Sequence, residues 1–156
     1  EVEQLIEYIK RVKRELPDVK VGYVDAYYMF LNYPEIVDEC DVILANCYPF
    51  WEYCSIDIAL SYMKQMYALV QESCSGKKII ISETGWPSKG EKYGDAVPSY
   101  DNAMSYFIQT HKWAKENNIE TFYFSSFDEI WKINHEGEYG AYWGIWDKEG
   151  IYKFDK

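Results

Sequence analysis

The chain has 156 residues, of which 48% are hydrophobic and 27% are charged, a balance typical of a folded globular domain with a sizeable core. The formal net charge of −10 repels phosphate backbones and anionic headgroups, so we expect neither nucleic acid nor a membrane as a partner. A neutral polysaccharide is compatible with this charge. Aromatic residues reach 19%, which suits stacking on sugar rings, although such side chains also fill cores.

The first half of the chain alternates helical and strand patterns. Apolar residues at helical spacing predict an amphipathic helix over residues 2–16, which Pro17 and Asp18 end. Next, the pattern predicts a strand over Val19 to Ala26, one or two helical turns over Pro34 to Glu39, and a strand buried on both faces over Asp41 to Asn46.

The second half continues this alternation. Ser55 is placed to cap a helix from Ile56 to about Ser73, and Gly76 to end it. There follow a strand over Lys78 to Ser82, a loop over Gly85 to Pro98, a helix over Tyr100 to Asn117 capped by Ser99, and a strand over Glu120 to Ser126. The βαβαβ order predicts an α/β fold with a parallel sheet, and we interpret residues 1–156 as a single domain.

The cysteines and histidines give no metal pattern. The spacings of the cysteines do not match C-x-x-C pairs, and His111 and His135 lie far from them in sequence, so we predict no metal site. One or two disulfides and buried free thiols both fit the four cysteines, which are Cys40, Cys47, Cys54 and Cys74. No glycine-rich phosphate loop follows the first strand, so a flavodoxin-like domain is disfavoured and no cofactor is expected.

Polar and aromatic residues follow the end of every predicted strand. In parallel α/β folds these ends meet at one edge, where ligands bind. Glu83 is the sharpest candidate, because it follows an Ile-Ile-Ile-Ser run where the core meets solvent. The strand-end residues are Asp25, Tyr27 and Tyr28 in the first case, Asn46, Tyr48, Phe50 and Trp51 in the second, Glu83 and Trp86 in the third, and Phe127, Asp128, Glu129, Trp131 and Lys132 in the fourth.

The segment Ile81-Ser-Glu-Thr-Gly-Trp-Pro-Ser88 resembles the signature of the family 17 glycoside hydrolases, the β-1,3-glucanases and their relatives. The resemblance implies that Glu83 closes strand seven of a TIM (β/α)8 barrel and is the nucleophile of a retaining mechanism. It also implies that Trp86 helps to shape the adjacent sugar subsite.

The resemblance extends over nearly the whole chain. Val42 to Trp51 resembles strand six of the family, Phe127 to Lys132 the end of strand eight, Gly140 to Asp147 the closing segment and, more loosely, Gly22 to Ala26 strand five. The chain would then be a half-barrel of about four strands. The resemblance implies that Glu129 and Lys132 support the nucleophile and that sugar contacts come from Asn46, Tyr48, Trp51, Trp86, Phe127, Trp131, Lys132 and Asp25. Asp128 is interpreted either as catalytic or as a ligand of a sugar hydroxyl or backbone amide.

A retaining glycosidase needs a second carboxyl group about 5–5.5 Å from the nucleophile. In the resembled family this acid/base Glu closes strand four in a Gly-Asn-Glu-like motif, and no Asn-Glu pair occurs in this sequence. We therefore expect the isolated chain to be weakly active or inactive, whereas the parent full barrel is an enzyme, secreted or associated with the cell envelope.

Three hypotheses account for the absent acid. The chain is one part of a barrel completed by an N-terminal half, or two copies close the barrel as a homodimer, or the chain is a scaffold that self-associates and binds glucan without cleaving it. In the dimer hypothesis, Glu129 of one copy approaches Glu83 of the other.

Overall fold

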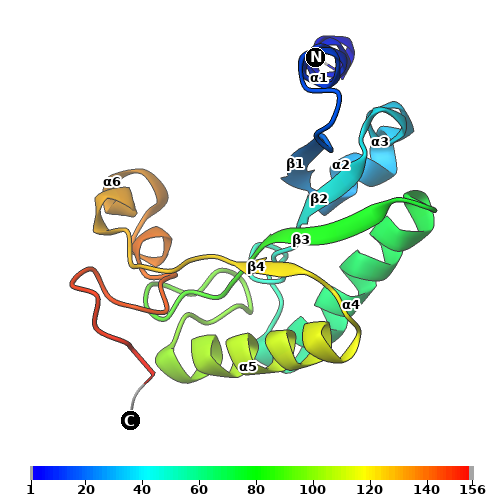
Figure 1. Ribbon diagram of the computed structural model, residues 1–156. Helices are drawn as coiled ribbons and strands as arrows, with labels where there is room; N and C mark the ends of the chain where they lie inside the picture. Colours follow the sequence, from blue (N-terminus) through cyan, green and yellow to red (C-terminus); the bar gives the residue numbers. More distant parts are fainter. Residues whose placement is uncertain (1, 155–156) are drawn as a thin grey trace.

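The computed structural model describes residues 2–154 and shows one four-stranded sheet. The strands are β1 (Gly22–Ala26), β2 (Val42–Asn46), β3 (Lys78–Thr84) and β4 (Thr121–Tyr123), all parallel and in chain order across the sheet. The predicted α/β fold with a parallel sheet is confirmed (Figure 1). Residue 1 and residues 155–156 of the predicted single domain lie outside the described residues.

The predicted helices are present, and two further helices, over residues 27–32 and 133–136, were not predicted. The helices are α1 (Val2–Glu15), α2 (Tyr27–Asn32), α3 (Pro34–Glu39), α4 (Ile56–Ser73), α5 (Tyr100–Glu116) and the short α6 (Ile133–Glu136), with 3-10 turns η1 (Ile130–Lys132) and η2 (Tyr139–Ala141). Aromatic residues form isolated helices poorly, so α2 depends on packing against α4, with Phe30 buried. No helix among residues 2–154 has the length and apolarity needed to span a bilayer.

The two predicted helix caps differ in their chemistry. Ser99 Oγ accepts a hydrogen bond from the backbone N–H of Asn102 at 3.1 Å, so its predicted capping role is confirmed. Ser55 occupies the N-cap position of α4, but its side chain makes no capping hydrogen bond there. Gly76 follows the end of α4 with φ +81°, a conformation that favours glycine.

Two strands are shorter than predicted by three residues or more, whereas β2 lacks only Asp41 and β3 extends to Thr84, beyond the predicted end at Ser82. The first begins at Gly22 rather than Val19, because its pairing with β2 starts at the Gly22–Val42 pair. The fourth ends at Tyr123 rather than Ser126. The backbone N–H of Phe124 still donates to the Thr84 carbonyl of β3 at 2.8 Å. From Ser125 the chain bonds to a different segment, since the backbone N–H of Ser125 donates to the Trp143 carbonyl at 3.1 Å.

The helices cover one face of the sheet. Along β2 the side chains alternate, with Ile43 and Ala45 buried towards the helices and Leu44 only partly buried on the other face. On β1 and β4, Val24 and Phe122 are 46% and 64% exposed. A second, mainly aromatic core lies beside the first, around Phe50, Trp86, Tyr106 and Trp143. The sheet is therefore open on one side.

The four cysteines are buried and unpaired, so of the two alternatives left by the sequence the structure shows free thiols. Burial raises the pKa of Cys47 to about 12, which makes this thiol unreactive at neutral pH.

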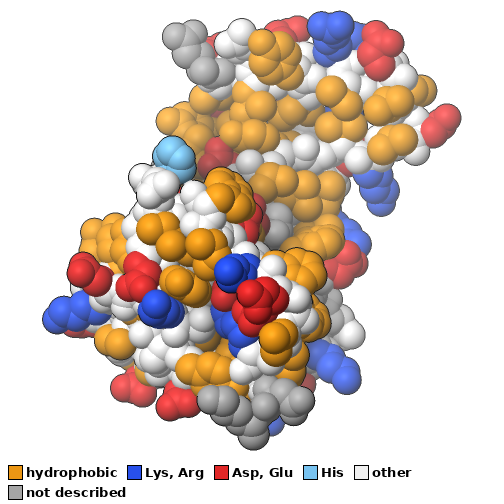
Figure 2. All heavy atoms as spheres, turned by 90° about the vertical axis from the view of Figure 1, so that its left-hand side faces the viewer, with side chains coloured by type: hydrophobic (Ala, Val, Ile, Leu, Met, Phe, Trp, Pro, Cys, Tyr) orange, Lys and Arg blue, Asp and Glu red, His pale blue; other side chains and the backbone are white. Residues whose placement is uncertain are grey.

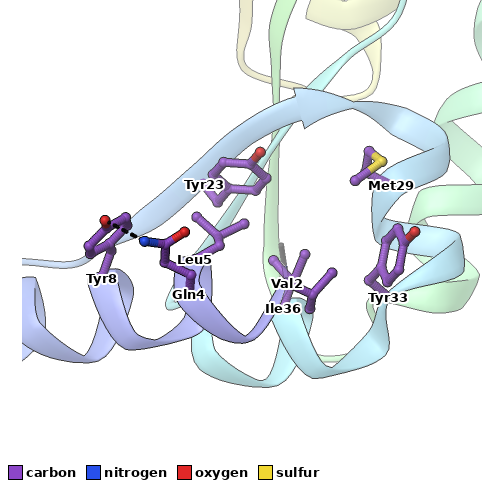
Figure 3. A pocket seen from close by; sticks show the side chains of 8 residues that line it. All are labelled: Val2, Gln4, Leu5, Tyr8, Tyr23, Met29, Tyr33 and Ile36. Carbon is purple, nitrogen blue, oxygen red and sulfur yellow. Dashed lines mark hydrogen bonds between the residues drawn. The ribbon is translucent and has the colours of Figure 1, made fainter.

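A hollow of about 410 Å³ lies where α1, β1, α2 and α3 meet, at the edge of the sheet (Figure 3). Its walls are mostly apolar and aromatic, and Gln4 donates a hydrogen bond to Tyr8 at its mouth. The residues that line it are Val2, Gln4, Leu5, Tyr8, Tyr23, Met29, Tyr33 and Ile36.

Candidate active site

Glu83 is placed by an irregularity in the pairing of β2 with β3. Ile81 pairs with Ala45, but the next pair is Asn46 with Glu83, so Ser82 is an extra residue on β3. Ser82 Oγ donates to Asn46 Oδ1 at 2.7 Å, and the backbone N–H of Cys47 donates to the Glu83 carbonyl at 2.9 Å. Two hydrogen bonds therefore tie the backbone around Glu83 to the end of β2, at the carboxyl end of the sheet.

The Glu83 carboxylate has a phenol as its partner. Tyr48 Oη donates to Glu83 Oε2 at 2.9 Å. Burial, with the negative charge of Glu83 and this hydrogen bond, holds the pKa of Tyr48 far above its ordinary value. Tyr48 therefore remains a proton donor throughout the physiological range, and its ring is wedged edge-on against Trp143 at a centroid distance of 5.5 Å.

A groove of about 420 Å³ adjoins this pair at the ends of β1 and β2. It brings together four predicted sugar-binding residues, Asp25, Asn46, Tyr48 and Trp51. Its other lining residues are Ala26, Tyr27, Tyr28 and Glu52. Glu52 was not predicted as a site residue, and the signal available was its position directly after Trp51 in the same strand-end segment.

Asp25 is less available to a ligand than the sequence suggests. Its Oδ2 accepts a hydrogen bond from Tyr23 Oη at 2.5 Å, and its Oδ1 accepts one from the backbone N–H of Ala26 at 2.7 Å. Each oxygen thus already has a partner within β1 and its end.

Glu129 and Lys132 form an ion pair across the η1 turn. Lys132 Nζ lies 2.6 Å from Glu129 Oε2, and the two side chains are 13% and 28% exposed. The same ammonium lies 4.6 Å from the centroid of the Phe124 ring, whose edge-on partner is Tyr48 at 6.5 Å. Phe124 thus connects this pair to the Tyr48–Glu83 pair. That Glu129 and Lys132 support the nucleophile stays a prediction.

Trp86 does not have the exposed ring that the sequence led us to expect. It is 1% exposed, its Nε1 donates to the Val97 carbonyl at 3.0 Å, and its ring contacts Phe50 and Tyr106 at centroid distances of 5.3 and 5.5 Å. The expectation that it touches sugar is corrected: the loop after β3 folds back and places this ring in the aromatic core.

The two remaining predicted aromatic residues are exposed but lie outside the groove lining. Phe127 and Trp131 are 54% and 67% exposed. Phe127 contacts Trp146 at a centroid distance of 5.9 Å. Figure 2 shows the side of the molecule where α6 and the C-terminal segment lie, and there hydrophobic side chains are interspersed with acidic and basic ones.

Asp128 binds a backbone amide, as one of its two predicted roles required. Its Oδ1 accepts hydrogen bonds from the Gly144 N–H at 2.9 Å and from Lys153 Nζ at 2.7 Å, and its side chain is 5% exposed. A carboxylate enclosed in this way cannot reach a substrate. Among the described residues, no cluster of His, Cys, Asp and Glu side chains is arranged to hold a metal ion.

A family model and individual relatives both relate this chain to glycoside hydrolases. A family model for the BtgE/BtgC glycoside hydrolase domain matches residues 1–144. The probable family 17 glucosidase SCW4 of Saccharomyces cerevisiae is 33% identical over 130 residues, which are 81% of this chain and 32% of that protein. Cell surface mannoprotein MP65 of Candida albicans is 32% identical over 127 residues, which are 79% of this chain and 32% of that protein.

A solved structure also matches almost the entire chain. It is an active-site mutant of the Rhizomucor miehei β-1,3-glucanosyltransferase in complex with laminaritriose, with 34% sequence identity and a TM-score of 0.88. The match covers 96% of this chain and 55% of that one. The chain thus spans between 32% and 55% of the length of these three relatives.

Proposed function

Because the chain belongs to the BtgE/BtgC glycoside hydrolase family, we propose that it supplies the nucleophile half of a retaining active site for β-1,3-glucan. The observation on which this depends is the hydrogen bond from Tyr48 Oη to Glu83 Oε2, at the carboxyl end of the sheet and beside a groove. The sequence match to family 17 glucosidases and the likeness to a β-1,3-glucanosyltransferase support it.

In this mechanism the Glu83 carboxylate attacks the anomeric carbon as the glycosidic C–O bond breaks, and the acid/base carboxyl of the complementing half protonates the departing oxygen. The product of this step is a covalent glycosyl-enzyme. Tyr48 holds Oε2 at 2.9 Å, so the attack falls to Oε1. The sugar then leaves to water or to the hydroxyl of another glucan chain. The acceptor decides between hydrolysis and transfer, and the Rhizomucor relative is a transferase.

The groove supplies the sugar contacts. Asn46 Oδ1 already accepts from Ser82, so the amide N–H groups of Asn46 are the part that donates to a sugar hydroxyl. Trp51 lines the same groove and offers an apolar ring face to a pyranose. Glu52 and the tyrosines beside it add hydrogen-bonding groups.

Glu129 is proposed to orient the site rather than to act as its acid. Its Oε2 already has Lys132 Nζ as a partner at 2.6 Å, so this oxygen is not free to deliver a proton to a departing sugar oxygen. This argues against the homodimer in which Glu129 of a second copy acts on Glu83. The acid/base carboxyl is proposed to come from a complementing N-terminal half-barrel.

The open side of the sheet is where that half would pack. Val24 and Phe122 are 46% and 64% exposed there, and β1 and β4 are edge strands. Apolar side chains and unpaired strand edges favour association. In the absence of the complementing half, self-association of the chain through the same surface is the alternative, with glucan binding but no cleavage. Like its mannoprotein relative, the parent protein is proposed to act at the cell surface.

The test measures binding and cleavage separately. Laminaritriose binding is followed by tryptophan fluorescence on the chain alone. Release of reducing ends from laminarin is followed with and without an N-terminal half-barrel cut from a full-length family member. We expect binding in the first case, cleavage only in the second, and loss of cleavage in Glu83→Gln. Glu91→Gln, in the exposed loop after β3, is the matched control.

Two results would count against the proposal. One is an unchanged cleavage rate in Glu83→Gln, and the other is the absence of any laminaritriose binding. For the dimer alternative, the decisive comparison is Glu129→Gln: if cleavage by the chain alone survives this substitution but not Glu83→Gln, pairing between copies is wrong. The sedimentation coefficient of Phe122→Glu shows whether the open side mediates self-association.

A further inference from the structure

Lys153 lies in the C-terminal segment, and its side chain is almost fully enclosed. Its Nζ donates to Asp128 Oδ1 and to Ser88 Oγ, both at 2.7 Å, and to the Tyr142 carbonyl at 3.5 Å. The Lys153 side chain is 13% exposed. An ammonium has three N–H donors, so each of them has an acceptor here.

Two of the three acceptors of the Lys153 ammonium lie close in sequence to the carboxylates of the proposed site, Glu83 and Glu129. Ser88 is in the loop that begins after Glu83, and Asp128 directly precedes Glu129. The third acceptor, Tyr142, is itself bound to Ser88, whose backbone N–H and Oγ donate to its carbonyl at 2.9 and 3.0 Å. One ammonium therefore connects the loop after β3 to the segment after β4.

The Asp128 side of this connection is equally constrained. The Gly144 N–H donates to the same Oδ1 at 2.9 Å, and the backbone N–H of Glu129 donates to the Ala141 carbonyl at 2.9 Å. A Cβ on Gly144 would lie 2.2 Å from the Asp128 backbone nitrogen, so the two segments are in tight contact. A shift of Asp128 is thus transmitted to Glu129.

Keeping the Lys153 ammonium charged in this enclosed position has an electrostatic cost, which an apolar side chain would not have. Burial lowers the pKa of Lys153 and outweighs the attraction of Asp128. Apolar side chains of similar volume would pack in such a place without that cost, which points to a role in geometry rather than in stability.

Resting on the proposed function, we infer that Lys153 is a positioning residue for the site. Through Asp128 and Ser88, its ammonium sets the position of the segment carrying Glu129 relative to the loop that follows Glu83. It does not contact the sugar. Loss of the ammonium leaves both segments folded but displaced relative to Glu83, and the site beside the groove loses affinity for glucan.

The test compares Lys153→Met, which keeps an unbranched apolar side chain, with the double variant Asp128→Asn/Lys153→Met. Lys148→Met is the control, because Lys148 is exposed and pairs only loosely, at 3.8 Å, with its neighbour Glu149. Three properties are measured: unfolding in urea, amide hydrogen exchange at Ser88 and Glu129, and laminaritriose binding.

Lys153→Met is expected to lose stability, because it leaves the Asp128 carboxylate buried without its counter-ion, and the double variant is expected to recover it. Both should exchange the Ser88 and Glu129 amides faster and bind laminaritriose about tenfold more weakly. Lys148→Met should match the parent chain in all three.

Normal exchange and binding in the double variant would overturn the inference, because Lys153 would then serve stability alone. The exchange measurement needs no ligand. Faster exchange in a chain that does not bind laminaritriose therefore supports the connection while refuting the proposed function, so the two failures are distinguishable.

Discussion

Phe50→Ala is expected to be among the most damaging single substitutions in the chain. Phe50 is 0% exposed, at the centre of the aromatic core between the site and α5. Five rings surround it, with centroid distances of 5.2 Å to Trp51, 5.3 Å to Trp86, 5.4 Å to Trp143, and 6.0 Å to both Tyr93 and Tyr139.

Truncation of a buried Phe to Ala costs about 3–5 kcal/mol, and the cost rises when neighbours cannot close the cavity. Rings fixed against one another close it poorly, so we expect a loss of about 4 kcal/mol in the free energy of unfolding. For a chain of this size, that loss lowers the melting temperature by about 8–16 °C. Laminaritriose binding should also weaken, because Phe50 supports Trp51.

The assay is urea unfolding followed by far-UV circular dichroism, since three of the contacting rings are tryptophans and fluorescence would change for other reasons. The control is Phe122→Ala on the open side of the sheet, 64% exposed, with an expected loss below about 1 kcal/mol. A loss below 1 kcal/mol for Phe50→Ala would refute the reasoning. A loss for Phe122→Ala as large as that for Phe50→Ala would show instead that the open side is covered in solution.

Three further substitutions or conditions test other parts of the structure. Gly85→Ala should destabilise the chain and reduce laminaritriose affinity, because a Cβ there would lie 2.0 Å from the Phe124 carbonyl oxygen, and calorimetry together with fluorescence titration would detect both effects. Tyr106→Phe should lower the free energy of unfolding by about 1–3 kcal/mol, since it leaves the buried Thr84 hydroxyl without its 2.7 Å partner, whereas an unchanged urea midpoint would contradict this. The free energy of unfolding should also fall in alkaline solution. The hydrogen bond to Asp25, together with burial, raises the pKa of Tyr23 from 10.0 to about 12. The stabilisation from the protonated Tyr23 hydroxyl is therefore complete below pH 10 and is lost as the pH rises through 12. Urea unfolding across that range should show a shallower decline in Tyr23→Phe.

The elements of the fold that the sequence predicted are those with a local signature. Helical spacing over residues 2–16 expresses the 3.6-residue period of a helix, and the continuous apolar runs after Asp41 and Lys78 are typical of buried strands. Both signals are local and do not depend on distant partners. For the same reason the strand-end positions of Glu83, Asn46 and Tyr48 were predictable. The resemblance to family 17 is confirmed by the family match and by the solved relative.

Tertiary structure decided the features that depend on segments distant in sequence. Helix α2 forms because α4 packs against it, and Trp86 is buried because its loop folds back under Val97. Ser82 is an extra residue only with respect to the pairing of β3 with β2, which the sequence of β3 does not specify. Lys153 meets Asp128 across 25 residues, a contact that no local pattern specifies. The sequence alone thus determined which side chains reach the carboxyl edge of the sheet, because the apolar runs that predict the strands are local. Which of them face the groove, and which become buried, was decided by packing between segments far apart along the chain.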